Sequence, residues 1–302
     1  MNSILPRPRL EVPPERPLDR ATIALLKDVQ AACEHLGAEF VLAGATARDV
    51  QMWHIHGIRA PVATRDVDVA VCAVSWEFHD ELIALLVETG RFRRAAKEQQ
   101  KLLFKRAEDR ALSQLDLVPF GPIEVPSGQI AWPPNGDIVM SVLGFREAVD
   151  TADDVNLGEG LTVPVVAIPA FILLKLVAWR DRRQYKNSDA SDLLFIFRQY
   201  FDAGNAERVY NEAQNLLDAY DFNVRLAAVG LLGRQARDVA GSETFDAIRT
   251  VLTSPIEYEK LRNDLQARAG AFMLGEFVDD SDELLAAFAK EFIGPAGKSV
   301  KP

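Results

Sequence analysis

Residues 41–71 read VLAGATARDVQMWHIHGIRAPVATRDVDVAV, and this stretch determines the predicted fold. An apolar run ends in the small-residue turn at 43–46, a helix-like segment follows, and the motif DVD at 66–68 lies inside a β-branched run. Glycine lets the backbone approach a ligand closely because it has no Cβ. Aspartates two positions apart on a strand point to the same face. The stretch therefore predicts a strand, a turn, a helix and a second strand that together bind a phosphate-bearing ligand and a divalent metal.

The composition is typical of a soluble globular protein. The chain has 302 residues, of which 48% are hydrophobic and 26% charged, and this length suffices for two domains. No apolar run approaches the roughly 20 residues of a transmembrane helix, and the first residues lack the apolar region of a signal peptide. Cys33 and Cys72 alone do not indicate a disulfide framework. We therefore expect a cytoplasmic protein without a membrane partner.

The charge distribution limits the classes of partner. A net charge of -10 argues against broad, nonspecific binding to nucleic acid, since phosphate contacts require clustered Lys and Arg. Residues 91–110 are nevertheless rich in basic side chains. Two interpretations stay open for this stretch: a solvated strand face, or a surface that approaches an acceptor nucleic acid or a triphosphate.

Local patterns divide the chain into three parts. Residues 1–19 are rich in proline and are predicted to form an extended N-terminal arm. Residues 20–165 alternate helical and β-prone segments and are predicted to form an α/β domain. Within them, residues 119–137 contain several prolines and glycines and are expected to form a long irregular loop. From Pro169 onward the pattern is helical, so residues 166–302 are predicted to form a C-terminal helical domain.

Three aspartates form the predicted metal site. Asp66 and Asp68 share one strand face, and Asp116 lies between Leu115 and Leu117 on a later strand, so it faces away from both leucines. Mg²⁺ prefers carboxylate oxygens and substrate phosphates, and a third carboxylate can also act as a base toward an acceptor hydroxyl. An isolated D-x-D pair more often lies on a solvated sheet face. Here the upstream glycine turn and the third aspartate favour the metal site.

The turn before the helix is the predicted phosphate site. Gly44, Ala45 and Thr46 would place backbone N–H groups and a hydroxyl at a helix N-terminus, which binds phosphate through its unpaired donors and its dipole. The alternative is that Thr46 only caps the helix. Arg48 also has two interpretations, an ion pair with Asp49 on the helix surface or a position near the phosphates.

A single lysine interrupts the apolar helix that follows Pro169. Lys175 must find a carboxylate, a phosphate or a path to water, so phosphate binding and snorkelling both stay open. Asp189 and Asp192 share one face of the next helix. Acidic residues suit the first turn of a helix, which is one interpretation of this pair. The other is that they position Lys175 or the nucleotide.

Together these motifs resemble the AbiEii-type nucleotidyltransferases, a bacterial group within the polymerase-β-like superfamily that contains many toxins of toxin–antitoxin systems. The resemblance covers about residues 20–200. It rests on AGATA at 43–47, TRDVD at 64–68, LDL at 115–117, the Lys175 helix and KNSDASDL at 186–193. It implies a polymerase-β-like α/β (α+β) domain with a mixed sheet, followed by a helical domain that completes the nucleotide cleft.

The resemblance also implies an activity. A nucleoside monophosphate would move from an NTP to an acceptor, with release of pyrophosphate and with Mg²⁺ or Mn²⁺ as cofactor. Gly44 and Thr46 would bind phosphate, Asp66 and Asp68 the metal, and Lys175 the nucleotide, while Asp189 would belong to the last family motif. The favoured acceptor is RNA, such as tRNA, or a protein, and a cognate antitoxin is a further expected partner. A small-molecule nucleotidyltransferase of the antibiotic-modifying type and a catalytically silent nucleotide-binding protein are the alternatives.

Overall fold

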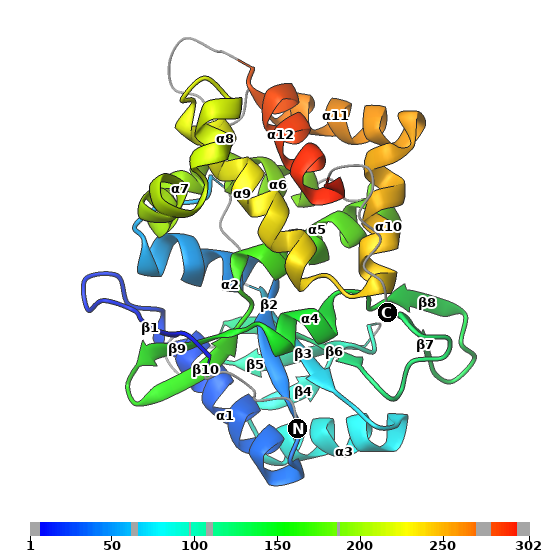
Figure 1. Cartoon of the computed structure of the whole chain (residues 1–302). Coiled ribbons are helices and arrows are strands. Elements are labelled where there is room, and N and C mark those ends of the chain that lie inside the picture. The colour runs from blue at the N-terminus through cyan, green and yellow to red at the C-terminus, as the bar shows by residue number, and fades with distance from the viewer. Residues whose placement is uncertain are drawn as a thin grey trace, which may run out of the picture. The chain divides into compact units, whose positions relative to one another are not determined.

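The structure is a computed structural model that describes residues 7–61, 66–96, 98–106, 111–185, 188–269 and 279–294. The parts of the predicted motifs at 64–65 and 186–187 lie outside these residues. The chain divides into two compact units, 1–171 and 172–302, and the division falls within helix α5 (Ile168–Arg182) (Figure 1).

An eight-stranded mixed sheet forms the centre of the first unit, in the order β1-β9-β10-β2-β3-β6-β5-β4. Its strands are β1 (Arg9–Glu11), β2 (Phe40–Ala43), β3 (Asp66–Cys72), β4 (Phe92–Arg94), β5 (Lys101–Lys105), β6 (Leu112–Phe120), β9 (Asp153–Gly158) and β10 (Leu161–Val165). Strand β3 runs antiparallel to β2 and parallel to β6. The α/β class with a mixed sheet that the sequence predicts is confirmed.

Two helices cover one side of this sheet. Helices α1 (Arg20–Leu36) and α3 (Trp76–Glu88) contact each other and lie on the same side of the strands (Figure 1). Helix α1 begins after Asp19, whose carboxylate accepts hydrogen bonds from two backbone N–H groups of the first turn, and it ends at Gly37 with φ +63°. The apolar, alternating residues Val67, Val69 and Val71 of β3 are buried in the core.

The segment that carries the glycine turn joins the two central strands β2 and β3. Strand β2 leads directly into α2 (Gly44–Asp49), which continues as the π-helical segment η1 (Val50–Ile55). All four residues of β2 are buried, so the strand fixes the position at which α2 begins.

Two stretches contain strands that the sequence does not predict: the N-terminal arm and the segment predicted as an irregular loop. Strand β1 lies within residues 1–19 and pairs with β9, so part of the arm extends the sheet. The prediction of an irregular loop over 119–137 is wrong in part, because β6 reaches Phe120, and β7 (Gln129–Trp132) pairs with β8 (Ile138–Ser141) in a two-stranded sheet. Trp132 packs against the Trp76 ring of α3, with ring centroids 5.1 Å apart. This aromatic contact supplies a tertiary reason for a strand that the local sequence does not predict.

The second unit is helical, and its C-terminal part confirms the predicted helical region. After α5 it contains α6 (Ser188–Gln199), η2 (Phe201–Asn205), α7 (Ala206–Glu212), α8 (Gln214–Ala219), α9 (Val224–Val239), α10 (Ser242–Thr253), α11 (Pro255–Ala269) and α12 (Ser281–Ile293). Helices α9 and α12 pack closely because Gly233 has no side chain: a Cβ there would lie 2.6 Å from the backbone oxygen of Phe288. Stacked rings of Phe288, Phe292 and Phe245 fill the core beside this contact.

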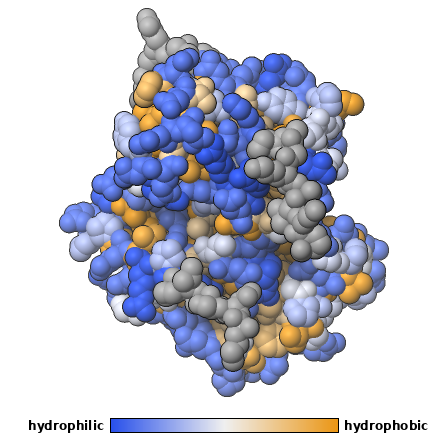
Figure 2. All heavy atoms as spheres, in the orientation of Figure 1, coloured by the Kyte–Doolittle hydropathy of each residue, from blue (hydrophilic) through white to orange (hydrophobic). Residues whose placement is uncertain are grey.

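The surface is mainly polar on the face seen in Figure 2, where hydrophilic residues surround scattered hydrophobic ones. This agrees with the net charge of -10. Among the described residues, none of the helices combines the length and the apolar character needed to cross a membrane.

Candidate active site

Three aspartates lie on one face of the central sheet. Asp68 of β3 lies directly opposite Asp116 of the parallel strand β6. Residues opposite each other on neighbouring strands point to the same face, and Asp66 shares that face because it lies two positions before Asp68. The structure thus brings together Asp66, Asp68 and Asp116, which we call the aspartate trio. Their catalytic and metal-binding roles stay predictions.

Asp116 lies in an environment that disfavours its ionised form. Burial and, next, the negative charge of Asp68 raise its pKa to about 6, while the nearby ammonium of Lys101 opposes this shift. Its Oδ1 is buried and accepts no hydrogen bond from the described residues. A raised carboxyl pKa means that the surroundings disfavour the negative charge of the ionised carboxylate. A bound cation would stabilise that negative charge.

The trio offers the hard oxygen ligands that Mg²⁺ and Mn²⁺ prefer. In the described ranges, no three His, Cys, Asp or Glu side chains are arranged as a ready-made metal cluster. Mg²⁺ does not require one, because it keeps several water ligands and is usually bound by one or two carboxylates together with substrate phosphates. The buried, hydrogen-bond-free oxygen of Asp116 beside Asp68 fits the carboxylate part of such a site.

Gly44 sets the distance between the start of α2 and the trio. Its φ of +62° lies in the left-handed region that glycine adopts without strain. A Cβ at this position would collide with the Asp68 carboxylate and would lie 2.7 Å from Asp68 Cβ. Glycine is therefore required here for two independent reasons, backbone conformation and space. Its predicted contact with phosphate stays a prediction.

The other polar residues of the turn are engaged within the protein. The Thr46 hydroxyl donates a 2.8 Å hydrogen bond to the backbone carbonyl of Asp66, which fastens α2 to the start of β3. Arg48 is 5% exposed and donates from Nε and Nη2 to Asp49 Oδ1, at 2.8 and 2.6 Å. The arginine of this pair is therefore buried, whereas the side chain of Asp49 is 24% exposed. Ala45 follows Gly44 in the first turn, and phosphate binding by Ala45, Thr46 and Arg48 stays a prediction.

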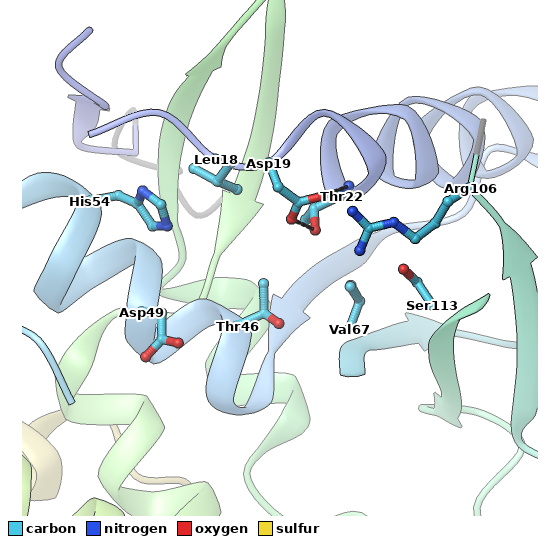
Figure 3. A pocket seen from close by; sticks show the side chains of 9 residues that line it. All are labelled: Leu18, Asp19, Thr22, Thr46, Asp49, His54, Val67, Arg106 and Ser113. Atoms are coloured by element: carbon cyan, nitrogen blue, oxygen red, sulfur yellow. Dashed lines mark hydrogen bonds between the residues drawn. The ribbon is translucent and has the colours of Figure 1, made fainter. Parts of the chain in front are cut away.

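A polar cavity of about 110 Å³ lies on the opposite face of the same strands (Figure 3). It is lined by Leu18, Asp19, Thr22, Thr46, Asp49, His54, Val67, Arg106 and Ser113. Val67 alternates with Asp66 and Asp68 along β3, so it points to the other face. Figure 3 shows a hydrogen bond at one side of the cavity between Asp19, which precedes α1, and Thr22 in its first turn. Arg106, which follows the end of β5, points into the cavity from the other side. This cavity is distinct from the aspartate trio.

The helical unit contains a buried ion network around Lys175. Its Nζ lies 3.1 Å from Asp189 Oδ1 and 2.6 Å from Asp192 Oδ2, and Arg182 donates two 2.8 Å hydrogen bonds to Asp189. Burial alone would lower the pKa of Lys175, but the charges of Asp192 and Asp189 raise it. Burial alone would raise the pKa of Asp189, but Arg182 and Lys175 lower it. Of the open interpretations, Lys175 thus finds carboxylates, and nucleotide contacts by Lys175, Asp189 and Asp192 stay predictions.

The basic stretch at 91–110 is partly neutralised by ion pairs. Arg91 pairs with Asp28 of α1, and Arg94 Nη2 lies 2.7 Å from Asp80 Oδ1 of α3. These contacts agree with the interpretation of this stretch as a solvated strand face. Arg93, at the β4 edge of the sheet, is exposed.

One functional candidate in this stretch is not predicted individually from the sequence. Lys101 of β5 lies directly opposite Asp116, and its Nζ is 3.9 Å from Asp116 Oδ1. The sequence shows only that Lys101 belongs to a basic run. The strand register, which the sequence does not give, brings it to the trio.

The comparison with known families decides the assignment. A family model described as "Nucleotidyl transferase AbiEii toxin, Type IV TA system" matches residues 25–287. The chain belongs to the AbiEii family. It is a nucleotidyltransferase, as the sequence motifs predict. In this AbiEii protein, the aspartate trio and Gly44 belong to the first unit, and the Lys175 network belongs to the second.

Several solved structures also match this chain, at low sequence identity. The antibiotic-resistance factor ANT(2'')-Ia is 14% identical, with 68% of this chain and 98% of that chain covered and a TM-score of 0.37. A nucleotidyltransferase-like protein from Paracoccidioides brasiliensis is 15% identical, with coverage of 66% and 90% and a TM-score of 0.39. JHP933 from Helicobacter pylori is 14% identical, with coverage of 84% and 97% and a TM-score of 0.33. None of the curated proteins matches the chain. The AbiEii assignment therefore rests on the family match.

Proposed function

We propose that this AbiEii enzyme transfers a nucleoside monophosphate from an NTP to an RNA acceptor, with tRNA favoured and protein as the second acceptor class, in a reaction that requires Mg²⁺ or Mn²⁺. The observation that carries the proposal is the aspartate trio, in which Asp68 lies opposite Asp116 and packs against the side-chain-free Gly44. Asp66, Asp68 and Asp116 would hold the metal. The Gly44 turn would approach the triphosphate with its backbone.

This arrangement supports the following reaction. The acceptor oxygen attacks the α-phosphorus, the bond from that phosphorus to the bridging oxygen breaks, and pyrophosphate leaves with the electron pair. Asp116, whose pKa is about 6, is mostly ionised at neutral pH and can take the proton of the acceptor hydroxyl. A bound divalent cation would neutralise charge on the triphosphate and on the leaving pyrophosphate. Asp116 therefore has a proposed role in both proton transfer and metal binding.

The biological role we propose is that of a cytoplasmic toxin held in check by a cognate antitoxin. The family match supports the toxin class. Both cysteines are free thiols, as expected for a reducing compartment. The exposed Arg93 at the edge of the sheet supports an acceptor with a phosphate backbone. Of these features, the exposed Arg93 is the one that supports RNA over an uncharged small molecule.

The acceptor is tested by incubating the protein with each α-labelled NTP and a whole-cell extract, and by separating RNA, protein and small molecules. We expect label in RNA with the wild-type protein and none with Asp116→Asn. Asp80→Asn is the matched control, because Asp80 is an exposed carboxylate of α3 that forms an ion pair with Arg94 of β4. If label appears only in small molecules, the RNA acceptor is wrong, and the enzyme modifies a small molecule of the antibiotic type.

The metal requirement is tested separately on the same reaction. A chelator should abolish labelling, and added Mg²⁺ or Mn²⁺ should restore it. Full activity in the presence of excess chelator would contradict the metal-binding role of the trio while leaving the acceptor result unaffected.

A further inference from the structure

Lys101 faces the aspartate trio from the neighbouring strand. Strand β5 pairs antiparallel with β6, so that Lys101 lies directly opposite Asp116, and Asp116 lies directly opposite Asp68 of β3. Residues paired in this way point to the same face of the sheet. One face therefore presents an ammonium and two carboxylates in a row across three strands.

The Lys101 ammonium lies between two carboxylates at different distances, those of Glu98 and Asp116. Lys101 Nζ is 3.0 Å from Glu98 Oε2 but 3.9 Å from Asp116 Oδ1. The side chains of Lys101 and Asp116 are 16% and 24% exposed, whereas that of Glu98 is 51% exposed. Glu98 thus holds the ammonium directly from the solvent side. The contact of the ammonium with Asp116 is weaker, because the 3.9 Å between Nζ and Oδ1 is close to the longest distance at which two charged groups count as an ion pair.

The Asp116 oxygen that faces Lys101 is the one suited to a cation. Oδ1 is buried and accepts no hydrogen bond within the described part of the chain. A cation bound to this oxygen would lie close to the Lys101 ammonium. Like charges a few ångströms apart repel strongly in a partly buried site, because water screens them poorly there.

Resting on the metal-dependent function proposed above, we propose that Lys101 is a built-in competitor of the divalent cation at Asp116. Without a cation, the ammonium offsets part of the negative charge of the trio. When a cation binds, the ammonium moves toward Glu98, with which it already forms its shorter contact. Binding of the free cation is therefore weakened, and Glu98 limits that weakening.

Two substitutions should change metal affinity in opposite directions. Lys101→Met removes the charge and keeps most of the side-chain volume, so Mn²⁺ should bind roughly fivefold more tightly, the scale of a single partly exposed ion pair. Glu98→Gln removes the second partner of the ammonium, so Mn²⁺ should bind more weakly than to the wild type. Lys101→Arg keeps the charge and should remain near the wild type. Lys105→Met is the matched control, since Lys105 is an exposed lysine at the far end of the same strand.

The measurement is isothermal titration calorimetry of the full chain with Mn²⁺ alone and with Mn²⁺ plus a non-hydrolysable NTP. Circular dichroism confirms the fold of each variant, and Lys101→Gln serves as a second charge-removing variant if Lys101→Met does not fold. Mn²⁺ binding that is lost in Asp116→Asn, tightened in Lys101→Met and weakened in Glu98→Gln supports the proposal.

The two possible failures are distinguishable. Mn²⁺ binding that depends on Asp116 but is equal or weaker in Lys101→Met overturns the competitor role and leaves the proposed function standing. The absence of Mn²⁺ binding to every variant, with and without the nucleotide, contradicts the metal-dependent function itself and overturns the inference with it.

Discussion

A single missing Cβ at Gly44 determines where the Asp68 carboxylate lies. The chain offers a matched comparison, because Gly37 has nearly the same φ, +63° against +62°, but open space around its Cβ position. Both glycines therefore have the same conformational requirement. Only Gly44 has the additional steric requirement set by Asp68.

Gly44→Ala should reduce nucleotide transfer by about 10²-fold, because displacement of a reactive carboxylate by about an ångström has effects of this size. Gly37→Ala should cost about 1 kcal/mol of stability through its left-handed backbone but leave transfer unchanged. Initial rates of labelling and chemical denaturation of both variants check this. Equal activity of the two variants would show that Asp68 does not need its observed position.

Asp116 combines a proposed functional role with a cost in stability. Its pKa is raised to about 6 from 3.8, so the folded state is penalised when the carboxyl ionises. This penalty is absent below the unfolded pKa and grows as the pH rises through 6. An enzyme that keeps such a group gives up stability for the charge of its site.

Asp116→Asn should lower transfer by roughly 10²–10⁴-fold and at the same time stabilise the protein by about 2–3 kcal/mol at pH 7.5. The gain over the wild type should fall to roughly half at pH 5, because the wild-type carboxyl then becomes protonated. Urea unfolding of both proteins at the two pH values measures this. A gain that does not depend on pH would mean that the stabilisation has another origin.

At the scale of elements, close packing of α9 and α12 depends on one of two neighbouring glycines. A Cβ at Gly233 would meet backbone atoms of α12, 2.6 Å from the Phe288 oxygen and 3.2 Å from the Phe292 nitrogen. A Cβ at Gly230 would meet only side-chain atoms, with the shortest distances at 3.3 Å. Side chains can move aside, whereas the backbone of a packed helix cannot.

Gly233→Ala should therefore destabilise the protein by roughly 1–3 kcal/mol through overpacking. Gly230→Ala should be within about 1 kcal/mol of the wild type, since the gain in helix propensity offsets a small adjustment of side chains. Thermal melting followed by circular dichroism compares them. Equal destabilisation by both substitutions would contradict the observed helix contact.

Helix α3 carries a histidine whose burial should make stability depend on pH. His79 is buried against Trp76 and Trp132, and burial lowers its pKa to about 4, against a smaller opposing effect of a hydrogen bond to the Leu117 backbone. The stability of the wild type is therefore complete above the unfolded pKa of 6.5 and is lost as the pH falls toward 4.

Between pH 7 and pH 5, His79→Phe should lose about 2 kcal/mol less of its free energy of unfolding than the wild type loses. The measurement is the free energy of unfolding of both proteins at the two pH values. An unchanged pH dependence would show that His79 does not remain neutral in the folded protein at pH 5.

The sequence predicts elements better than contacts between them. The grouping of three aspartates on one sheet face is predictable, because Asp66, Asp68 and Asp116 follow strand periodicity within β-prone runs. The contact of Lys101 with Asp116 depends on the register of β5 against β6, which composition does not encode. Strand β7 is missed because Trp132 is held by side chains of α3 and not by a local β pattern. The engagement of Thr46 with the Asp66 carbonyl is likewise a tertiary contact.

At the scale of the whole molecule, membership of a toxin family has a cellular consequence. Induced expression of the wild-type protein in a bacterial host should arrest growth, because modified acceptor accumulates. Asp116→Asn at the same protein level should not, while Asp80→Asn should arrest growth like the wild type. Growth curves combined with immunoblots check the three proteins. Arrest by Asp116→Asn would show that toxicity does not come from nucleotide transfer.

The order of strands in the sheet also determines when the site exists during synthesis. Asp66 and Asp68 leave the ribosome with β3, but their partner Asp116 arrives later with β6, and β10, which flanks β2, arrives later still. A domain folds as a unit once enough of its chain has emerged. A nascent chain therefore has no complete trio before β6 has emerged, and the order of synthesis sets the earliest point at which the three carboxylates can meet.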